Sequence, residues 1–136
     1  MRLELSRKSD LAVRALCVLA REDRVKAKDL SETIGTTASF LPQVMAPLVR
    51  AGWVRSDRGP TGGYELAVPL AEISMLELLE TTEGPIDRSR CVLRGGMCSD
   101  GEVCALHDAW FPARDSLLSK LGATSVAAGC GGSSRG

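Results

Sequence analysis

The sequence predicts a mainly helical fold with one small β-hairpin. Several stretches repeat apolar residues at helical spacing, and a Gly- and Pro-rich turn, DRGPTGG, separates two short alternating segments. A chain of 136 residues suits one domain, or one domain with an appendage. Its 17 basic and 17 acidic residues balance, so net charge alone indicates no polyanionic partner.

The N-terminal half predicts three helices in succession. Residues 9–20 carry apolar side chains at helical spacing, with Ser9 and Asp10 as alternative N-caps. A short helix over 27–34 ends at a glycine, and a third helix over about 38–51 follows the polar run TTAS. Two short helices joined by a tight Gly-containing turn are typical of a helix-turn-helix.

Two prolines fall inside the third predicted helix. Pro42 suits the first turn, where a missing N–H costs little. Pro47 lies in the interior, where proline removes a hydrogen bond and kinks a helix. The sequence therefore predicts a bend or an early end near Pro47.

A hairpin completes the N-terminal half. Residues 53–55 and 64–66 alternate like short strands on either side of DRGPTGG. Helix, turn, helix and hairpin together predict a winged helix-turn-helix over residues 1–68. This half has 11 basic and 8 acidic residues up to residue 66, which leans it toward nucleic acid.

The C-terminal half predicts a linking helix and a long dimerisation helix. An amphipathic helix over 73–82 occupies the linking segment 69–90, and the chain is helical again after His107, mainly over 108–122. An apolar stripe on a helix of so short a chain needs a surface to bury it. We assign three of its residues to a homodimer interface, with packing inside one chain as the alternative: Trp110, Leu117 and Leu121.

The expected compartment is the cytoplasm, with no membrane partner. No apolar run approaches the ~20 residues that a membrane span needs, and the opening MRLELSRKSD lacks the apolar core of a secretory signal. In a reducing compartment, clustered cysteines are more often metal ligands or redox centres than disulfides.

Residues 91–107, CVLRGGMCSDGEVCALH, hold Cys91, Cys98, Cys104 and the single histidine, His107. Thiolates are the soft ligands that hold iron–sulfur clusters. Zinc knuckles usually use tighter Cys pairs than this C-x6-C-x5-C-x2-H spacing, so the pattern favours a cluster over zinc. A zinc site and a loop of redox-inert thiols are the alternatives.

The remaining cysteines are expected to be inert. Cys17 lies inside the first predicted helix, where a thiol usually fills the core. Cys130 lies in the small, polar segment 123–136, which predicts a disordered tail. We interpret Cys130 as an exposed bystander.

With the wing and the cysteine stretch in view, the chain resembles the Rrf2 family of bacterial transcription regulators over about residues 1–121. The family includes the iron–sulfur cluster regulator IscR and the nitric-oxide-sensing repressor NsrR. The stretches MRLELSRKSDLAVRAL, RGPTGGY and LELLETTEG carry the resemblance, together with the cysteines of residues 91–107. It implies a homodimer on palindromic double-stranded DNA operators, a C-terminal helix that crosses to the partner, and often a bound iron–sulfur cluster.

Three cysteines leave one position of a four-ligand cluster to fill. His107 follows Cys104 by about one helical turn, and the resemblance implies that it completes a 2Fe–2S cluster, which we favour over 4Fe–4S. Asp10 is the alternative ligand, because SDLAVRAL resembles the stretch of the nitric-oxide-sensing branch whose aspartate reaches the partner subunit's cluster. An N-cap role is the simpler interpretation of Asp10.

The third helix and the wing supply the expected DNA contacts. Gln43 can pair with adenine edges in the major groove, while Thr37 and Ser39 can hold phosphates. An arginine at the wing tip suits a narrow minor groove, and the other arginines suit phosphates. The expected DNA-binding residues are Arg2, Arg7, Thr37, Ser39, Phe40, Gln43, Arg55, Arg58 and Gly59.

The sequence thus predicts a DNA-binding regulator that senses redox state, iron–sulfur status or nitric oxide through a cluster in residues 91–107. A regulator that uses only thiols or zinc is the main alternative, and a cluster carrier is a weaker one. An enzyme is not expected, because the chain has no nucleophile–base pair and no phosphate-binding glycine loop.

Overall fold

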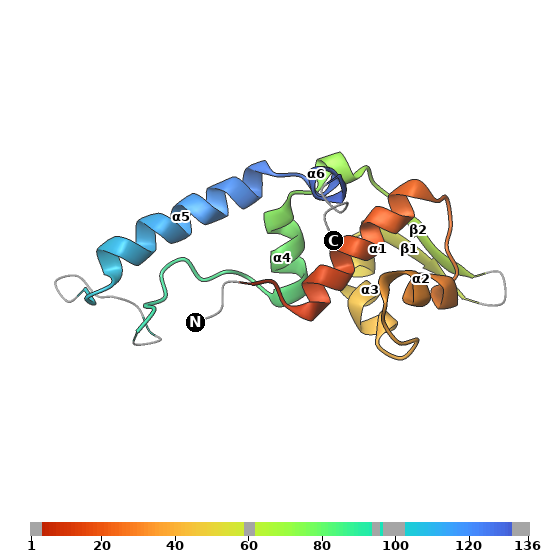
Figure 1. Cartoon of the computed structure of the whole chain (residues 1–136), viewed down its shortest axis with the longest axis horizontal. Coiled ribbons are helices and arrows are strands. Elements are labelled where there is room, and N and C mark those ends of the chain that lie inside the picture. The colour runs from red at the N-terminus through yellow and green to blue at the C-terminus, as the bar shows by residue number, and fades with distance from the viewer. Residues whose placement is uncertain (1–3, 59–61, 94–95, 97–102, 132–136) are drawn as a thin grey trace.

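The computed structural model describes residues 4–58, 62–93, 96 and 103–131. A helical body carries a two-stranded antiparallel sheet, and one long helix projects from it (Figure 1). This confirms the predicted fold class. In chain order the elements are α1 (Arg7–Arg21), α2 (Ala27–Ile34), α3 (Leu41–Arg50), β1 (Val54–Asp57), β2 (Gly63–Leu66), the 3-10 turn η1 (Leu70–Glu72), α4 (Met75–Glu83), α5 (His107–Ala123) and α6 (Val126–Cys130).

Helix α1 begins earlier than the sequence predicts. Its N-cap is Ser6, whose side chain accepts the N–H of Ser9 at 3.2 Å, so neither predicted cap is correct. Ser9 is instead fully buried and shares a 2.6 Å hydroxyl contact with Thr82 of α4. The buried apolar face of α1 lies on the other elements of the body and consists of Leu11, Ala12, Ala15, Leu16, Val18 and Leu19.

Helices α2 and α3 form the predicted helix-turn-helix. Gly35 ends α2 at φ 80°, a left-handed conformation that costs glycine little. Pro42 occupies the first turn of α3, as predicted. Of the two predicted outcomes at Pro47, the early end is wrong, because α3 continues to Arg50, and a bend stays a prediction. Tertiary burial holds this last turn, since Pro47 and Leu48 both lie in the core face of the helix.

The wing is tied to the body by backbone pairing. Strands β1 and β2 pair in register from Val54 opposite Leu66 to Asp57 opposite Gly63. Tyr64 exchanges two backbone hydrogen bonds with Val25 in the α1–α2 connection, at 2.8 and 3.0 Å. A Cβ on Gly63 would stand 2.4 Å from the Val25 carbonyl oxygen, so this close approach requires glycine.

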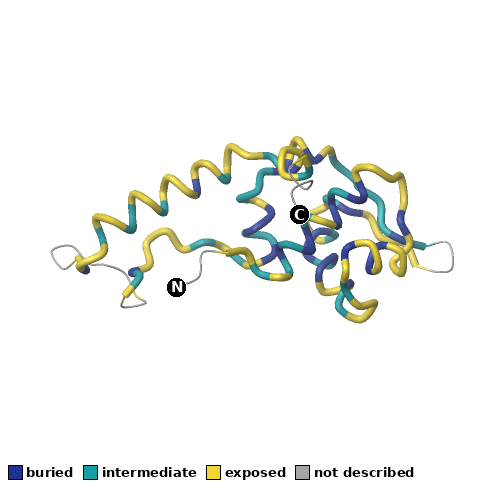
Figure 2. The backbone as a smooth tube through the Cα atoms, viewed as in Figure 1, coloured by how far each residue is buried: buried dark blue, intermediate teal, exposed yellow. Residues whose placement is uncertain are grey.

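Helix α4 packs on α1 and α3, and α5 extends away from them (Figure 1). A capping box between Ser74 and Glu77 starts α4. After α4 the described chain runs beneath α5 in the view of Figure 1, and α5 begins at His107. Most of α5 is exposed along its length, and Leu118 is its buried residue (Figure 2).

The predicted disordered tail is wrong for residues 123–131. Helix α6 packs on α1 and η1, with Val126 fully buried and its N–H donated to the Ile73 carbonyl at 2.8 Å. The two cysteines expected to be inert are joined as a Cys17–Cys130 disulfide, with Cα atoms 5.6 Å apart. Helices α1 and α6 are far apart in sequence, and they meet because both have apolar faces to bury. The end of the predicted tail, 132–136, lies outside the described residues.

Over the part of the chain that the structure describes, no helix has both the length and the apolar character needed to span a bilayer.

Gly63→Ala tests the close approach between the wing and the α1–α2 connection. The added methyl group would press on backbone rather than on a mobile side chain, so we expect the free energy of unfolding to fall by about 1–3 kcal/mol in denaturant titration. The control is Gly122→Ala in α5, where a Cβ meets only a Leu76 methyl at 3.6 Å. Helix propensity predicts unchanged or slightly raised stability for the control. Equal effects of the two changes would refute the steric argument.

Candidate functional site

The N-terminal end of α3 presents polar side chains to solvent. Thr37 accepts the N–H of Phe40 through its hydroxyl at 3.1 Å and contacts the Ser39 hydroxyl at 3.2 Å, which orders the turn that leads into the helix. Thr37, Ser39 and Gln43 are exposed. Phe40 is half-buried and packs on the core, so its ring is committed mainly to the body. The three polar residues remain predicted DNA contacts.

A groove of about 860 Å³ separates α3 from the wing. Its wall combines the start of α2, the exposed side of α3 and both strands of the hairpin. Burial raises the pKa of the Tyr64 hydroxyl in this wall, so the phenol stays neutral at physiological pH. The groove suits a polyanion because four basic residues line it: Lys26, Lys28, Arg50 and Arg58.

Three of these basic residues were absent from the predicted contacts. Lys26, Lys28 and Arg50 look in sequence like ordinary solvated charges, and only the folded surface places them beside Arg58. Residue spacing carries no signal that would have distinguished them.

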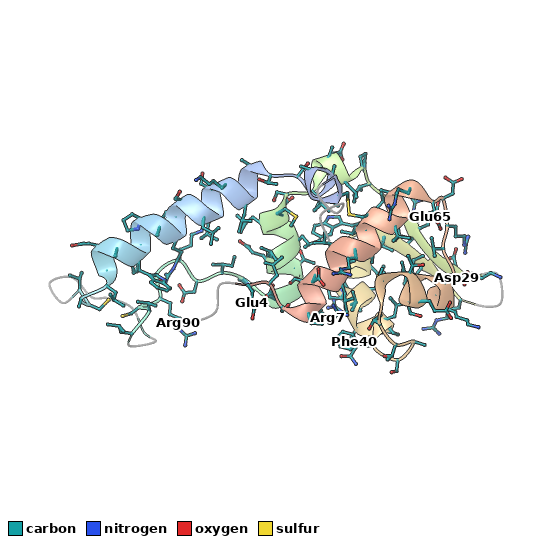
Figure 3. The ribbon with its side chains drawn as sticks, viewed as in Figure 1. Glu4, Arg7, Asp29, Phe40, Glu65 and Arg90 are labelled. Atoms are coloured by element: carbon teal, nitrogen blue, oxygen red, sulfur yellow. A yellow bond between two sulfur atoms is a disulfide. The ribbon has the colours of Figure 1, made fainter. Side chains whose placement is uncertain are left out.

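Arg7 braces the helix-turn-helix as well as facing solvent. Its guanidinium donates to the Gly35 carbonyl at 3.2 Å, across the turn between α2 and α3 (Figure 3). A second donation, at 3.3 Å, reaches Asp10. Arg55 lies exposed on β1. The other two predicted contacts, Arg2 and Gly59, lie outside the described residues.

The cysteine segment places two reduced thiols in buried positions. Cys91 is 2% exposed and Cys104 is 5% exposed, while Cys98 lies outside the described residues. Within the described ranges, no three His, Cys, Asp or Glu side chains gather as a metal site. The described part of the segment therefore includes three of the four predicted ligands, Cys91, Cys104 and His107, but does not gather them as a metal site.

His107 is the first residue of α5 and carries an unsatisfied ring nitrogen. Its backbone N–H donates to the Cys104 carbonyl at 3.1 Å, which couples the helix start to the second buried thiol. Its Nδ1 is buried without a hydrogen-bond partner. A buried polar atom without a partner costs free energy, and metal ligation is one way in which an imidazole nitrogen is satisfied. The donor chemistry of this segment thus fits a thiolate–imidazole cluster site.

Arg114 fastens the segment before Cys91 to α5. Its Nη1 donates to the backbone carbonyls of Arg90 at 2.9 Å, Arg88 at 3.2 Å and Asp87 at 3.5 Å. The guanidinium also lies 4.9 Å from the centre of the Phe111 ring, which stacks on His107 at 4.2 Å. Arg114, Phe111 and His107 therefore form one column of side chains along α5. This column connects the backbone just before Cys91 with the imidazole of His107 at the end of the cysteine segment. The sequence reasoning missed Arg114 and Phe111, because neither belongs to a ligand motif.

A local turn also shapes the approach to Cys91. The Ser89 hydroxyl and backbone N–H donate to the Asp87 carboxylate at 2.6 and 2.9 Å. These hydrogen bonds lower the pKa of Asp87. Since a lowered carboxyl pKa supports the folded turn only while the group is ionised, this contribution weakens as the pH falls through that pKa.

Asp10 lies on α1 within the body, and its carboxylate is engaged. Arg7 and Arg14 approach its two oxygens at 3.3 and 3.2 Å. Ligation of a cluster by Asp10 would have to compete with both ion pairs. The N-cap interpretation is wrong, as Ser6 caps the helix.

The three residues assigned to a dimer interface line one apolar groove. Leu117 is 52% exposed, and Trp110 and Leu121 are half-buried beside it. The groove has a volume of about 710 Å³ and runs between α5 and α4. Leu5, Leu79 and Ile86 complete its apolar wall. Dimerisation through this groove remains a prediction.

Comparison with known proteins identifies the family. The Rrf2 family, described as "Iron-dependent Transcriptional regulator", matches residues 5–128. This chain belongs to the Rrf2 family.

Curated relatives agree with the assignment. A Mycobacterium tuberculosis protein named "Putative HTH-type transcriptional regulator" is 37% identical over 133 residues, which cover 96% of this chain and 83% of that protein. IscR of Photorhabdus laumondii is 33% identical over 127 residues, covering 91% of this chain and 77% of IscR.

Solved structures show the same winged fold. CymR, the global cysteine regulator of B. subtilis, superposes with a TM-score of 0.77 and 26% identity over 96% of this chain and 98% of CymR. IscR of T. potens superposes with a TM-score of 0.70 and 27% identity, over 93% of this chain and 85% of IscR. The Rrf2 protein described here is therefore a DNA-binding transcriptional regulator and not an enzyme.

Arg58→Ala and Gln43→Ala test two of the predicted DNA contacts of this Rrf2 protein. Arg58→Ala removes one cation that is predicted to contact a phosphate or the minor groove. The change should weaken binding to all duplexes and reduce the slope of log affinity against log salt by about 0.9. Loss of Gln43 should instead relax preference at one base pair, by about 1–3 kcal/mol. Fluorescence anisotropy on a duplex selected from a random library measures both. Lys120→Ala in α5 is the matched charge control, and an equal salt effect there would contradict the assignment.

Arg114→Gln tests the clamp on the cysteine segment. Three backbone carbonyls lose a charged donor, so amide hydrogen exchange over residues 86–92 should accelerate while exchange in α1 stays unchanged. Lys120→Gln, on the same helix, serves as the charge-matched control. Protection of residues 86–92 that survives the Arg114 change would show that the clamp is not what orders them.

Proposed function

We propose that this Rrf2 regulator works as a homodimer whose operator affinity is set by an iron–sulfur cluster, with 2Fe–2S favoured over 4Fe–4S. Cys91, Cys98 and Cys104 supply the thiolates, and His107 supplies the fourth ligand. The supporting observation is the His107 ring nitrogen, which is buried and unsatisfied at the start of α5, where the His107 backbone N–H donates to the carbonyl of the buried Cys104. A bound cluster supplies a centre that responds to oxidation, nitric oxide or iron–sulfur supply.

The choice of His107 over Asp10 follows from their surroundings. The imidazole has a ring nitrogen with no protein partner, whereas both oxygens of Asp10 already accept from arginines. Imidazole is also a softer ligand than carboxylate and suits iron beside thiolates.

Helix α5 is the route from the sensing segment to DNA. Its first residue, His107, belongs to the proposed ligand set, and the same helix carries Trp110, Leu117 and Leu121 along the proposed dimer groove. When the cluster is altered or lost, the start of α5 becomes less ordered. The contacts of Phe111 and Arg114 transmit this change to the packing of α5. The tilt of the two helix-turn-helix units in the dimer then changes. A coupling of about 1–3 kcal/mol corresponds to about 5- to 150-fold in operator affinity.

A thiol- or zinc-based switch is the alternative function. The observation that favours it is that Cys91 and Cys104 are both reduced, since a thiol can be oxidised or can ligate zinc. A cluster carrier is a weaker alternative, because its task would not need the basic groove beside the wing.

Anaerobic purification followed by visible spectroscopy with iron and sulfide assays tests the proposal. We expect charge-transfer bands with iron and sulfide in matching amounts. His107→Ala should bleach or shift these bands, whereas Asp10→Ala should leave them nearly unchanged. The hydrogen exchange of α5 gives a readout independent of colour, and it should slow at the helix start when the cluster is bound.

The outcomes separate the alternatives. A colourless protein without iron or sulfide after reconstitution would refute the cluster, and zinc in the metal analysis would select the zinc switch. A spectrum that depends on Asp10 and not on His107 would reverse the ligand assignment.

A further inference from the structure

We propose that Cys17 and Cys130 are a reversible dithiol–disulfide couple, a second redox site separate from residues 91–107. Their sulfur atoms are bonded, and their Cα atoms lie 5.6 Å apart although 113 positions separate them in sequence. Cys17 belongs to α1 in the DNA-binding body, and Cys130 is the last residue of α6. The pair therefore fastens the C-terminal end of the described chain to the first helix.

The bond adds a covalent link to a short strap, residues 124–131, whose start is held by hydrogen bonds and whose helix α6 packs on α1 and η1. Thr124 and Val126 hold that start, through a 2.8 Å hydrogen bond from the Met75 N–H to the Thr124 carbonyl and another from the Val126 N–H to the Ile73 carbonyl. The fully buried Val126 side chain adds to this anchor. Helix α6 has only five residues, too few to be stable by itself.

Breaking the disulfide therefore releases a limited part of the molecule. Residues 127–131 lose their covalent anchor, while the hydrogen bonds at Thr124 and Val126 and the core beneath them persist. A switch needs such a local change, because a disulfide that held the whole core could not be reduced without unfolding the protein.

The surroundings allow small reagents to reach the sulfur atoms. Cys17 and Cys130 are both half-buried, and Ala127, Ala128 and Gly129 of α6 are exposed. Exposure of this kind distinguishes exchangeable disulfides from those sealed in a core.

The chemistry balances with hydrogen peroxide as the oxidant and glutathione as the reductant. One thiolate attacks the peroxide oxygen, forming a sulfenic acid and releasing water after protonation. The second thiol displaces the sulfenic oxygen as a second water and forms the S–S bond, so the two thiols lose two electrons and two protons in total. Two glutathione thiols reverse the reaction by exchange and become glutathione disulfide.

The consequence for DNA binding follows from the chain order. Helix α6 comes directly after α5, and α1 packs against both α2 and α3. The closed disulfide therefore adds a covalent link between α6 and α1, the helix against which the recognition helix packs. A dimer with this joint fixed is better preorganised for two half-sites, so the oxidised form should bind an operator more tightly, by at least fivefold.

The test uses the full chain with Cys91, Cys98 and Cys104 replaced by serine, so that only Cys17 and Cys130 remain and no cluster interferes. In mixtures rich in oxidised glutathione, the number of titratable thiols per chain should fall from two to none. In mixtures rich in reduced glutathione it should return to two, and no disulfide-linked dimers should form. Hydrogen exchange should be slow over residues 127–131 in the oxidised form and fast in the reduced form. Anisotropy on a duplex selected by the reduced variant measures the affinity change.

The same variant with Cys130→Ser is the matched control, and neither its exchange nor its DNA affinity should respond to peroxide. In the wild-type chain, differential alkylation and mass spectrometry should find the same reversible 17–130 bond. A disulfide that resists excess reduced glutathione would be a permanent structural bond, and this result would overturn the proposal. So would equal operator affinity in the two states, or bonds that form only between chains.

Discussion

The burial of α1 is the constraint on which the rest of the structure depends. Its apolar face, from Leu11 to Leu19, is almost fully removed from water and contacts α2, α3, α4, α6 and β2. Because all of these elements pack on α1, this helix determines the positions of the recognition helix and the wing. It also sets where the linking helix leaves the body. Burial of this kind supplies the main favourable free energy of a small domain, and here it also supplies the geometry.

Polar contacts connect α1 to α4, and α5 to the backbone before Cys91, where the proposed sensing segment begins. Ser9 of α1 is buried against Thr82, and its hydroxyl also reaches the Glu83 carboxylate at the end of α4. Farther out, Arg114 ties α5 to the backbone before Cys91. Buried and charge-assisted hydrogen bonds are directional, so each joint permits fewer arrangements than apolar packing alone. The molecule thus has defined joints between its DNA-binding half and α5.

The candidate site was predictable where it depends on local sequence. Thr37, Ser39 and Gln43 follow from the start of a helix after a tight turn, and His107 follows from its spacing to Cys104. The basic groove was only partly predictable, because Lys26, Lys28 and Arg50 come from separate elements and converge only on folding. Arg114 and Phe111 were not predictable, since their roles depend on a loop that returns alongside α5.

The sequence by itself determined the helices, the wing and the clustering of thiols around one histidine, because hydrophobic periodicity, turn residues and ligand spacing are local properties. Tertiary structure alone decided three features. Ser6 caps α1 because Ser9 is needed in the interface with α4. Helix α3 passes Pro47 because burial outweighs one lost hydrogen bond. The tail folds because Val126 finds a core position and Cys130 meets Cys17, contacts between residues too distant in sequence for any local pattern to encode.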